Sequence, residues 1–398
     1  MIKIKQLEDK YNIEGKRVLL RVDFNVPIND GSITESSRIE KVLPTIKSLI
    51  NKKAKIVIIS HLGRPKGKVV PELTLKPIAT KLSSYLNKDV FFLNSIVGEN
   101  VVKKTKETSH GEILMLENLR FFEGEESNSQ SFAKDLSKNA DIYINEAFSC
   151  SHREHASVSA ITKHIESYAG EMMLKEINVI KMLTNGAKKP VTCIIGGSKI
   201  STKIGVLLNL IKKMDNIIIV GAMANNFIRH KGFKIGTSLF EKNQENLLND
   251  IIKKCEINNC NLILPNDVIV SKNVNSKGQL KNLDQINDDQ SILDIGKKTI
   301  ENISKIIDES KTVLWNGPAG YFEVKEFSTG SNEIAKKITE NTKNKSLISI
   351  AGGGDTAAAI KMFKYENNFT YISTAGGAFL ELLEGKILPG IKALELNE

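Results

Sequence analysis

Short, nearly continuous apolar runs alternate with amphipathic stretches through the first part of the chain. The runs lie within RVLLRVDFNVP, KIVIISHLGRPKG, DVFFLN, EILMLENLRF and DIYINEAFS, and most of them end in turn-forming residues. Between them, residues 36–51 and 74–87 place apolar side chains at helical spacing. Strands that are apolar on both faces and that alternate with helices are typical of a parallel sheet covered by helices on both sides.

The second part of the chain repeats this architecture, although no sequence repeat of fixed period is present. Its apolar runs lie within VTCIIGG, NIIIVGAM, NLILPNDVIV, TVLWNGPAG, SLISIAGGGDT and FTYISTAGGA. Several of them end in a glycine-containing turn that leads into a helical pattern. We therefore predict an α/β fold of two doubly wound, Rossmann-like parallel-sheet domains, which agrees with the domain count that 398 residues suggest.

A single amphipathic helix is predicted between the two domains, over GEMMLKEINVIKMLTNGAKKP. Asn185 and Gly186 provide its C-terminal end, and Pro190 stops it. A helix that links two domains can act as a hinge. We predict a first domain at residues 1–170, and a hinge helix with the second domain at residues 171–387.

The net charge of +10 raises the question of nucleic-acid binding, and its distribution argues against that class. The 56 basic residues are 49 lysines and 7 arginines. Residues 1–170 carry 26 basic and 21 acidic side chains, residues 171–398 carry 30 and 25, and each part is therefore +5. A diffuse lysine-rich surface without runs of like charge keeps a protein soluble and does not imply a nucleic-acid partner.

Neither the cysteines nor the apolar segments indicate secretion, a zinc site or a membrane. Cys150, Cys193, Cys255 and Cys260 are too few and too scattered for a disulfide framework. The last two lie five residues apart without a nearby histidine or a second pair, so no zinc site is expected. The N-terminus lacks the apolar core of a signal peptide, and no apolar stretch approaches the ~20 residues of a membrane helix. We expect a cytoplasmic protein without a membrane partner.

Arginine is distributed differently from lysine, because every arginine except Arg229 lies within the first 153 residues. A guanidinium group grips phosphate or carboxylate through two hydrogen bonds, which an ammonium group cannot do. The polar residues that follow predicted strands or begin a helix here are Asp23, Asn25, Arg38, His61, Arg64, Arg120 and Arg153, and Gly63 lets the backbone turn between His61 and Arg64. Carboxyl ends of parallel strands share one edge of the sheet, and helix N-termini favour anions. Together these residues predict an anion pocket, although each alone could be a turn cap or a loop ion pair.

Two glycine-containing turns in the second domain could hold a polyphosphate. IIGGSKISTK fails the pattern GxxxxGK[ST], but it places Lys199 and Lys203 four residues apart, on one predicted helical face near a helix N-terminus. IAGGGDTAAAI offers backbone N–H groups, Asp355 as a ligand for Mg²⁺, and Thr356 as a helix cap or phosphate donor. The alternative for the lysines is an ordinary solvated surface. In WNGPAGYFE, Asn316, Pro318 and Glu323 suit a base and a ribose, and Trp315 is expected in the core.

These stretches together resemble the phosphoglycerate kinase family. The resemblance spans nearly the whole chain in one order, through RVDFNVP, HLGRP, LENLRF, HREH, GGSKISTK, GTSLF, WNGPAGYFE, GGGDT and STAGGAFLELLEGKILPG. It implies reversible, Mg²⁺-dependent phosphoryl transfer between 1,3-bisphosphoglycerate and ADP, giving 3-phosphoglycerate and ATP after closure about the hinge. It also implies a monomer, with phosphoglycerate on the first domain, the nucleotide on the second, and the tail 388–398 packed back on the first domain.

The resemblance also implies roles for individual residues. Phosphoglycerate would be bound by Asp23, Phe24, Asn25, Arg38, His61, Leu62, Gly63, Arg64, Arg120 and Arg153. The nucleotide would be bound by Gly196, Lys199, Lys203, Gly221, Leu239, Leu293, Asn316, Pro318, Glu323, Gly353, Gly354, Asp355 and Thr356. The catalytic residues would be Arg38, Lys199, Gly353 and Gly354, with Asp355 nearest Mg²⁺.

The chain departs from the family pattern at three places. Asn225-Asn226 stand where an aromatic or small residue followed by threonine is frequent, Asn266 stands where valine is usual, and Ala375 stands where glycine is common. Ala375 lies near the expected phosphate path, and none of the departures removes a residue with a chemical role.

Two alternative functions have sequence features that argue against them. A nicotinamide dehydrogenase would carry GxGxxG with an acidic residue about 20 positions further on at a first strand–helix turn, and no such pattern occurs. A nucleic-acid-binding protein would have its positive charge concentrated, whereas the two parts of this chain share it equally.

Overall fold

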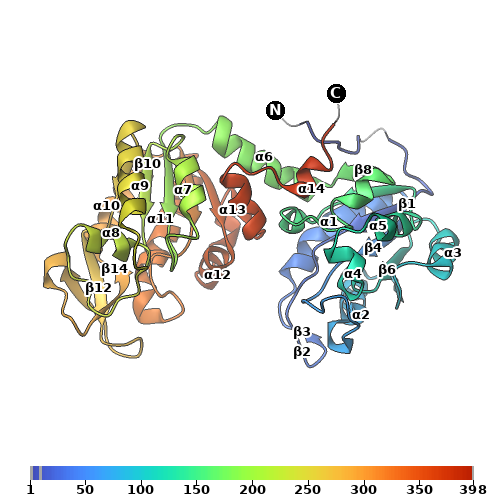
Figure 1. Cartoon of the computed structure of the whole chain (residues 1–398), viewed down its shortest axis with the longest axis horizontal. Coiled ribbons are helices and arrows are strands. Elements are labelled where there is room, and N and C mark those ends of the chain that lie inside the picture. The colour runs from blue at the N-terminus through green and yellow to red at the C-terminus, as the bar shows by residue number, and fades with distance from the viewer. Residues whose placement is uncertain (1–2, 9–10, 397–398) are drawn as a thin grey trace. The chain divides into compact units, whose positions relative to one another are not determined.

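The computed structural model describes residues 3–8 and 11–396, and these residues form two compact units (Figure 1). Unit 1 contains the chain up to Asn178 together with the segment from Ile387 onward, and unit 2 contains Val179–Lys386. The division falls inside helix α6 (Glu171–Asn185), which ends at the predicted Asn185. The predicted join at residues 170 and 171 lies at the beginning of this helix.

Unit 1 is built on a parallel sheet with the strand order β5-β6-β4-β1-β7-β8. Its strands are β1 (Arg17–Arg21), β4 (Lys55–Ile59), β5 (Val90–Leu93), β6 (Ile113–Leu116), β7 (Ile142–Asn145) and β8 (Glu166–Ala169). Its helices are α1 (Ser37–Asn51), α2 (Lys76–Leu86), α3 (Glu99–Glu107), α4 (Glu123–Glu126), α5 (Gln130–Ser137) and α14 (Pro389–Lys392). A short hairpin, β2 (Ile28–Asn29) and β3 (Ser32–Ile33), precedes α1.

The strand period of two explains how the unit 1 sheet is covered on both faces. Val18 and Leu20 of β1 pack in one core cluster with residues of α1 and α2. Leu19, between them, packs in a second cluster with residues of α3 and α5. The expected arrangement of continuous apolar strands between two helical layers is confirmed.

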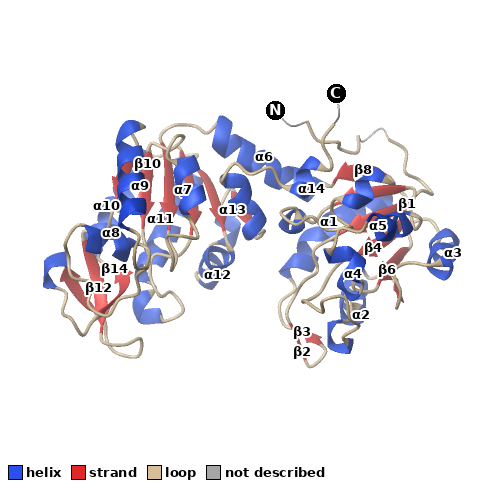
Figure 2. Ribbon diagram, in the orientation of Figure 1, coloured by secondary structure: helices blue, strands red, loops and turns tan. Residues whose placement is uncertain are grey.

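Unit 2 repeats the arrangement of strands between helices (Figure 2). The strand order of its parallel sheet is β11-β10-β9-β15-β16-β17. Its parallel strands are β9 (Val191–Ile195), β10 (Asn216–Ile219), β11 (Asn261–Ile263), β15 (Thr312–Asn316), β16 (Ile348–Gly352) and β17 (Tyr371–Ser373). Its helices are α7 (Ile204–Leu210), α8 (Ala224–His230), α9 (Glu245–Ile257), α10 (Lys297–Glu309), α11 (Thr329–Asn344), α12 (Gly354–Met362) and α13 (Gly377–Leu383). Trp315 of β15 is fully buried, as expected.

The structure contains a small sheet that the hydrophobic pattern did not predict. The run NLILPNDVIV divides at Pro265 into β11 and β12 (Asp267–Ser271). β12 pairs antiparallel with β13 (Gln279–Asn282) and β14 (Ser291–Ile295). β13 is largely exposed and polar, so it carries no apolar run by which it could be recognised.

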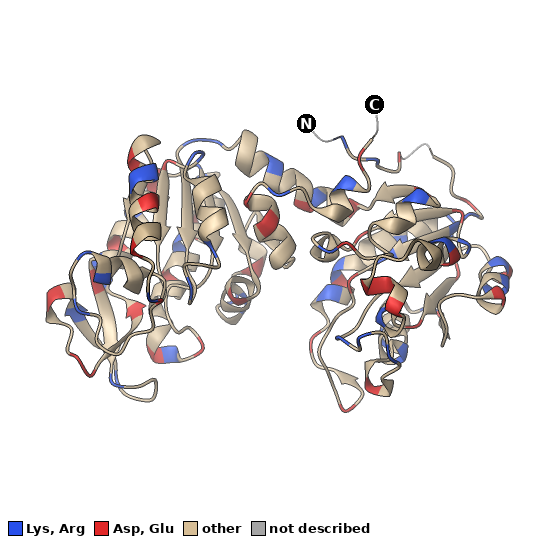
Figure 3. Cartoon of the chain, viewed as in Figure 1, with Lys and Arg blue, Asp and Glu red and all other residues tan. Residues whose placement is uncertain are grey.

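Both parallel sheets reverse their strand order next to their first strand, where ligands of open α/β sheets bind. In unit 1, β4 and β7 flank β1, and in unit 2, β10 and β15 flank β9. Acidic and basic residues are interspersed over the elements of each unit (Figure 3), in agreement with the diffuse charge expected. Within the described residues, no helix is long and apolar enough to span a bilayer.

Candidate active site

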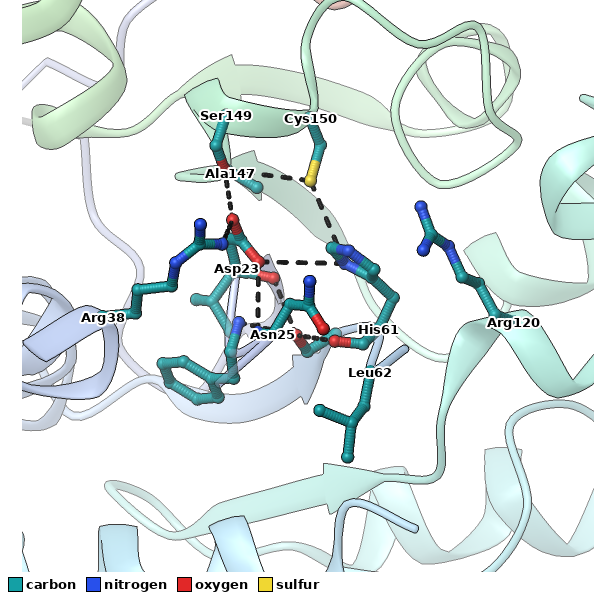
Figure 4. A network of polar contacts seen from close by, with 12 residues as sticks. Asp23, Asn25, Arg38, His61, Leu62, Arg120, Ala147, Ser149 and Cys150 are labelled. Carbon is teal, nitrogen blue, oxygen red and sulfur yellow. Dashed lines mark hydrogen bonds and ion pairs between the residues drawn. The ribbon is translucent and has the colours of Figure 1, made fainter. Parts of the chain in front are cut away.

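Asp23 is the centre of a polar network where the chain leaves β1 (Figure 4). Its carboxylate accepts hydrogen bonds from the Arg38 guanidinium at the start of α1, from the Ser149 hydroxyl, and from the backbone N–H of Asn25 at 3.1 Å. The Asn25 side-chain oxygen in turn accepts from the Gly63 N–H at 2.9 Å. These contacts join the end of β1, the end of β4 and the beginning of α1 at one edge of the sheet.

Asn118 shapes the loop that carries His61 and Arg64. Its side chain accepts from the Leu62 N–H at 3.1 Å and donates to the Leu62 carbonyl at 2.8 Å. Gly63 has φ +61°, a left-handed conformation that favours glycine, and a Cβ there would have to push aside the end of the Leu73 side chain, 2.8 Å away. Arg120 donates to the Gly63 carbonyl at 2.5 Å, which fixes this loop against the end of β6.

Guanidinium groups surround two histidines in this region. Burial, together with the charges of Arg21, Arg120 and Arg153, lowers the pKa of His61 well below its ordinary value. Burial and the same arginines lower the pKa of His155 to about 3. Both rings are therefore neutral at pH 7, and the positive charge of the arginines is only partly balanced by nearby carboxylates. Such a site favours an anion.

Arg21 is the member of this cluster that the sequence prediction left out. It is 1% exposed, and it donates to the Ser157 hydroxyl at 3.0 Å and contacts His61 Nδ1 at 3.2 Å. Ser157 is also bonded to the buried carboxylate of Glu125, whose pKa is raised by burial. In the sequence, Arg21 lies within an apolar strand and gives no sign of a role. The structure shows that it is buried beside His61, where its charge contributes to the electrostatic potential of the pocket.

The predicted phosphoglycerate residues differ in how they could reach a ligand. Arg64 is exposed, and Arg38 and Arg153 are partly exposed, whereas His61 and Arg120 are buried. Phe24 and Leu62 are in the core, at 0% and 3% exposure. Their side chains are therefore not available to a bound molecule.

Asp23, His61 and Cys150 place possible metal-ligating atoms within 4.8 Å of one another. The Arg21 guanidinium contacts His61 Nδ1 at 3.2 Å and Cys150 Sγ at 3.7 Å. A cation there would have to displace a buried positive charge from both ligand atoms, so the arrangement fits an anion pocket better than a metal centre.

Unit 2 contains a cavity of about 460 Å³ at the carboxyl ends of its strands. The predicted nucleotide residues that line it are Gly221, Leu239, Leu293, Pro318, Glu323 and Asp355. Asn225, one of the departures from the family pattern, also lines it. This cavity has the size, and the mixture of apolar walls and few polar groups, that are typical of a small-molecule site.

The turns next to this cavity approach one another too closely for side chains. A Cβ on Gly196 would lie 2.2 Å from the Pro318 carbonyl oxygen, and one on Gly221, where φ is +66°, would lie 2.9 Å from the same atom. These glycines allow the ends of β9, β10 and β15 to meet. Glycine is therefore required at these two positions for steric reasons, independently of any bound molecule.

The prediction that Lys199 and Lys203 share one helical face is wrong. Helix α7 begins at Ile204 with Lys203 as its N-cap residue, and Lys199 precedes it in an irregular turn. Lys203 is partly buried, its ammonium group donates to the Asn316 side chain, and burial lowers its pKa. Lys199 is exposed. The chain turns between the two lysines because this segment is held by contacts from elsewhere in unit 2.

The glycine turn after β16 is attached to the end of β15. Asn316 donates to the Gly352 carbonyl at 2.6 Å, and Gly353, with φ +96°, is the N-cap residue of α12. The Thr356 hydroxyl accepts from the Gly317 N–H at 2.7 Å, so it joins two turns and does not cap the helix. Gly354 and Asp355 are exposed in the first turn of α12.

Asp355 has the properties of a magnesium ligand. Its exposed carboxylate lines the cavity. Mg²⁺ is held by one or two carboxylates and completes its shell with water and phosphate oxygens. The residues present therefore fit a cation that arrives together with a nucleotide.

Asn266 and Ala375, the other two departures from the family pattern, are each held by one backbone hydrogen bond to a nearby hydroxyl group. Asn266 is exposed, and its backbone N–H donates to the Thr299 hydroxyl at 2.9 Å. Ala375 is 8% exposed before α13, and its N–H donates to the Ser373 hydroxyl at 3.3 Å.

An arginine-rich anion site in one α/β unit and a cavity bordered by glycine turns in the other are the features of a phosphotransferase. The phosphoglycerate kinase family model matches residues 7–386. A phosphoglycerate kinase of Wolbachia sp. subsp. Drosophila simulans (strain wRi) is 46% identical over 386 residues, covering 96% of this chain and 97% of that protein. One of Chelativorans sp. (strain BNC1) is 42% identical over 397 residues, covering 99% of this chain and 100% of that protein.

Solved structures agree with these sequence matches. The phosphoglycerate kinase of Coxiella burnetii has a TM-score of 0.89 at 39% identity, with 97% of each chain covered. That of Pyrococcus horikoshii OT3 has a TM-score of 0.83 at 32% identity, with 98% of each chain covered. The chain belongs to the phosphoglycerate kinase family, as its motifs indicated. It is a phosphotransferase of glycolysis, and this assignment favours the kinase over the dehydrogenase and nucleic-acid-binding alternatives.

Proposed function

We propose that the chain binds the two substrates of its family's reaction on different units. Phosphoglycerate would bind to residues 1–170 with the tail 388–398, and the nucleotide to residues 171–387. This assignment rests on one observation: the two units have different kinds of binding site. Arginines surround neutral, buried histidines in unit 1, whereas unit 2 has a glycine-walled cavity of about 460 Å³.

In unit 1, the exposed and half-exposed guanidinium groups of Arg64, Arg153 and Arg38 are the groups best placed to meet phosphate and carboxylate oxygens. Arg120 and His61 would act from the buried side of the pocket, and Asp23 and Asn25 would accept hydrogen bonds from a hydroxyl group. Gly63 would form part of the wall, and the buried Phe24 and Leu62 would pack behind it. Neutral His61 can donate to an oxyanion without adding charge.

In unit 2, the apolar cavity walls at Leu239, Leu293 and Pro318 would hold the base, and Glu323 the ribose diol. The phosphates would lie toward Lys203, Asn316 and Thr356, with the turns at Gly196 and Gly221 forming the floor. The Lys203 ammonium group donates to the Asn316 side chain, and neither residue lines the cavity, which supports a phosphate position outside the base pocket.

Asp355 would hold Mg²⁺ together with the nucleotide phosphates. Bound there, the cation would neutralise phosphate charge and orient the oxygens for transfer. The carboxylate is exposed, so it can take part in this coordination without first breaking a buried contact.

The reaction needs positioning and charge neutralisation, and it does not need a general base. The acceptor is a phosphate oxygen in one direction and a carboxylate in the other, and both are ionised at pH 7. Arg38, Lys199 and the N–H groups of Gly353 and Gly354 would stabilise the transferred phosphoryl group during in-line transfer. Movement about α6 would bring the substrates together and exclude water from the acyl phosphate. We further propose a cytoplasmic monomer that acts without a nucleic-acid or membrane partner.

A coupled assay tests the proposal. Purified protein with 3-phosphoglycerate, ATP and Mg²⁺ should form an acyl phosphate that a glyceraldehyde-phosphate dehydrogenase reduces with NADH, and the absorbance loss should stop when Mg²⁺ is chelated. Isothermal titration of each substrate alone, into wild-type protein and an Arg64→Ala variant, tests the division between units. Loss of ATP binding in that variant would contradict the division, while loss of phosphoglycerate binding alone would support it.

A further inference from the structure

Glu241 lies on the segment between α8 and α9 and contacts the turn that follows Lys199. One carboxylate oxygen accepts from the Ser201 N–H at 2.9 Å, and the other accepts from the Ser201 hydroxyl at 2.6 Å. Burial raises the pKa of Glu241, but hydrogen bonds from Ser201 and from the Ile200 backbone, together with the charge of Lys199, lower it overall. The carboxylate therefore satisfies the donors that the chain presents immediately after Lys199.

Asn226 holds Glu241 itself. The Asn226 side chain donates to the Glu241 carbonyl at 2.7 Å and accepts from the Glu241 N–H at 3.2 Å. It is 4% exposed on α8, so both bonds are shielded from water. The neighbouring Asn225 donates to the Leu239 carbonyl at 2.9 Å. The two asparagines that depart from the family pattern thus anchor the segment from Leu239 to Glu241.

The turn that carries Lys199 is attached to the same part of unit 2 at its other end. The Gly197 carbonyl accepts from the N–H of Met223, the N-cap residue of α8, at 2.9 Å. Within the turn, the Thr202 hydroxyl donates to the Lys199 carbonyl at 2.9 Å. The Lys199 backbone is therefore held between two anchors, one at Met223 and one at Glu241, while its side chain remains exposed.

We propose that Glu241, fixed by Asn226, is a positioning residue that sets where Lys199 presents its ammonium group to the transferred phosphoryl group. This rests on the role proposed above for Lys199. Glu241 touches no reacting atom in this scheme, and it acts by holding the Ile200–Ser201 backbone. An ionised acceptor at a turn of free N–H groups holds that turn more firmly than a neutral acceptor does.

Glu241→Gln is the first test, because the variant keeps the side-chain length and replaces one acceptor oxygen by a donor. The Ser201 hydroxyl, which donates to the carboxylate at 2.6 Å, must then accept from the amide nitrogen, and the turn loses its ionised acceptor. We expect kcat to fall between about tenfold and 100-fold, since small misplacements of catalytic groups cost that much, with KM for ATP changed less than about twofold. Glu245→Gln, four residues later on the exposed surface of α9, is the matched control and should leave both constants unchanged.

Hydrogen exchange provides a readout that is independent of activity. In Glu241→Gln, peptides covering residues 197–204 should exchange faster, and peptides covering α11 should not. Unchanged exchange in residues 197–204 would overturn the proposal. Faster exchange with unchanged kcat would also overturn the proposal, because Glu241 would then hold the turn without affecting the reaction.

A double variant separates this proposal from the proposed role of Lys199. If Glu241 acts through Lys199, then Lys199→Ala/Glu241→Gln should have the same kcat as Lys199→Ala, so that the two effects do not multiply. Multiplied effects would overturn the proposal. A Lys199→Ala variant with normal turnover would instead refute the role of Lys199, and the two failures are therefore distinguishable. If Glu241→Gln does not fold, Ser201→Ala removes one donor at an exposed position and should show the same changes at smaller size.

Discussion

Lowering the pH should destabilise unit 1 through His155, and replacing this residue by glutamine should remove that dependence. The His155 side chain is 12% exposed, and its Nδ1 lies 3.8 Å from Glu125 Oε1. Burial and the charges of Arg120, Arg21 and Arg153 lower its pKa to about 3. In an unfolded chain the same ring would have a pKa of about 6.5.

The sign and size of the effect follow from proton linkage. Above pH 6.5 the ring is neutral in both states, so it contributes no pH dependence. As the pH falls below 6.5, the unfolded state takes up a proton that the folded state excludes, and stability is lost. Between pH 7.5 and 5.5 the free energy of unfolding should therefore fall by about 1.4 kcal/mol, because protonation of the unfolded state over this range corresponds to about one pKa unit, or about 1.36 kcal/mol. Solvent screening at the exposed edge of the ring reduces the expected loss to about 1 kcal/mol.

Urea unfolding of wild-type protein and His155→Gln at pH 7.5, 6.5 and 5.5 measures this effect. Hydrogen exchange of peptides from β1 and β7 reports on unit 1, and fluorescence of Trp315, the single tryptophan, reports on unit 2. The unit 1 stability of the variant relative to wild type should improve by about 1 kcal/mol from pH 7.5 to 5.5. The free energy of unfolding of unit 2 should change with pH by the same amount in both proteins. If the free energy of unfolding of unit 1 changes with pH by the same amount in both proteins, the lowered pKa of His155, which burial and the arginine charges together produce, is refuted.

Three further variants test individual contacts. Lys199→Ala should lower kcat at least tenfold and change nucleotide affinity much less, because the Lys199 ammonium group is assigned to the moving phosphoryl group. Steady-state kinetics with ATP and 3-phosphoglycerate measure both effects. Unchanged turnover would exclude Lys199 from the mechanism. Arg64→Ala should raise KM for phosphoglycerate about tenfold and leave that for ATP near normal, whereas equal effects would contradict separate binding units. Thr356→Val should destabilise unit 2 by about 1–3 kcal/mol, because the Gly317 N–H loses its 2.7 Å acceptor. Trp315 fluorescence in urea measures this, Thr356→Ser should retain most of the stability, and equal losses in both variants would argue against the hydrogen bond.

Much of the architecture could be predicted because it is encoded locally. Continuous apolar runs, followed by turns and helical periodicity, correctly indicated parallel sheets between helical layers in both units. The end of α6 at Asn185 followed from its Asn-Gly signal. Since parallel strands share a carboxyl edge, even the convergence of Asp23, Asn25 and Gly63 could be expected from strand ends far apart in sequence.

The parts that could not be predicted depend on contacts between distant segments. Local spacing placed Lys199 and Lys203 on one helix, but Glu241, 40 residues from Ser201, holds the intervening turn outside α7. An alternating or apolar pattern could not reveal β13, which is exposed and polar on a small antiparallel sheet.

The sequence by itself determined the family, the two-unit α/β architecture and the residue types at each strand end, because short-range periodicity and collinear motifs encode them. The tertiary structure decided which of those side chains are usable and in what charge state. It buried Phe24 and Leu62, and it placed Arg21 beside His61. The physical reason is that burial and Coulomb interactions depend on distances in space, and these are set only when segments separated along the chain pack together.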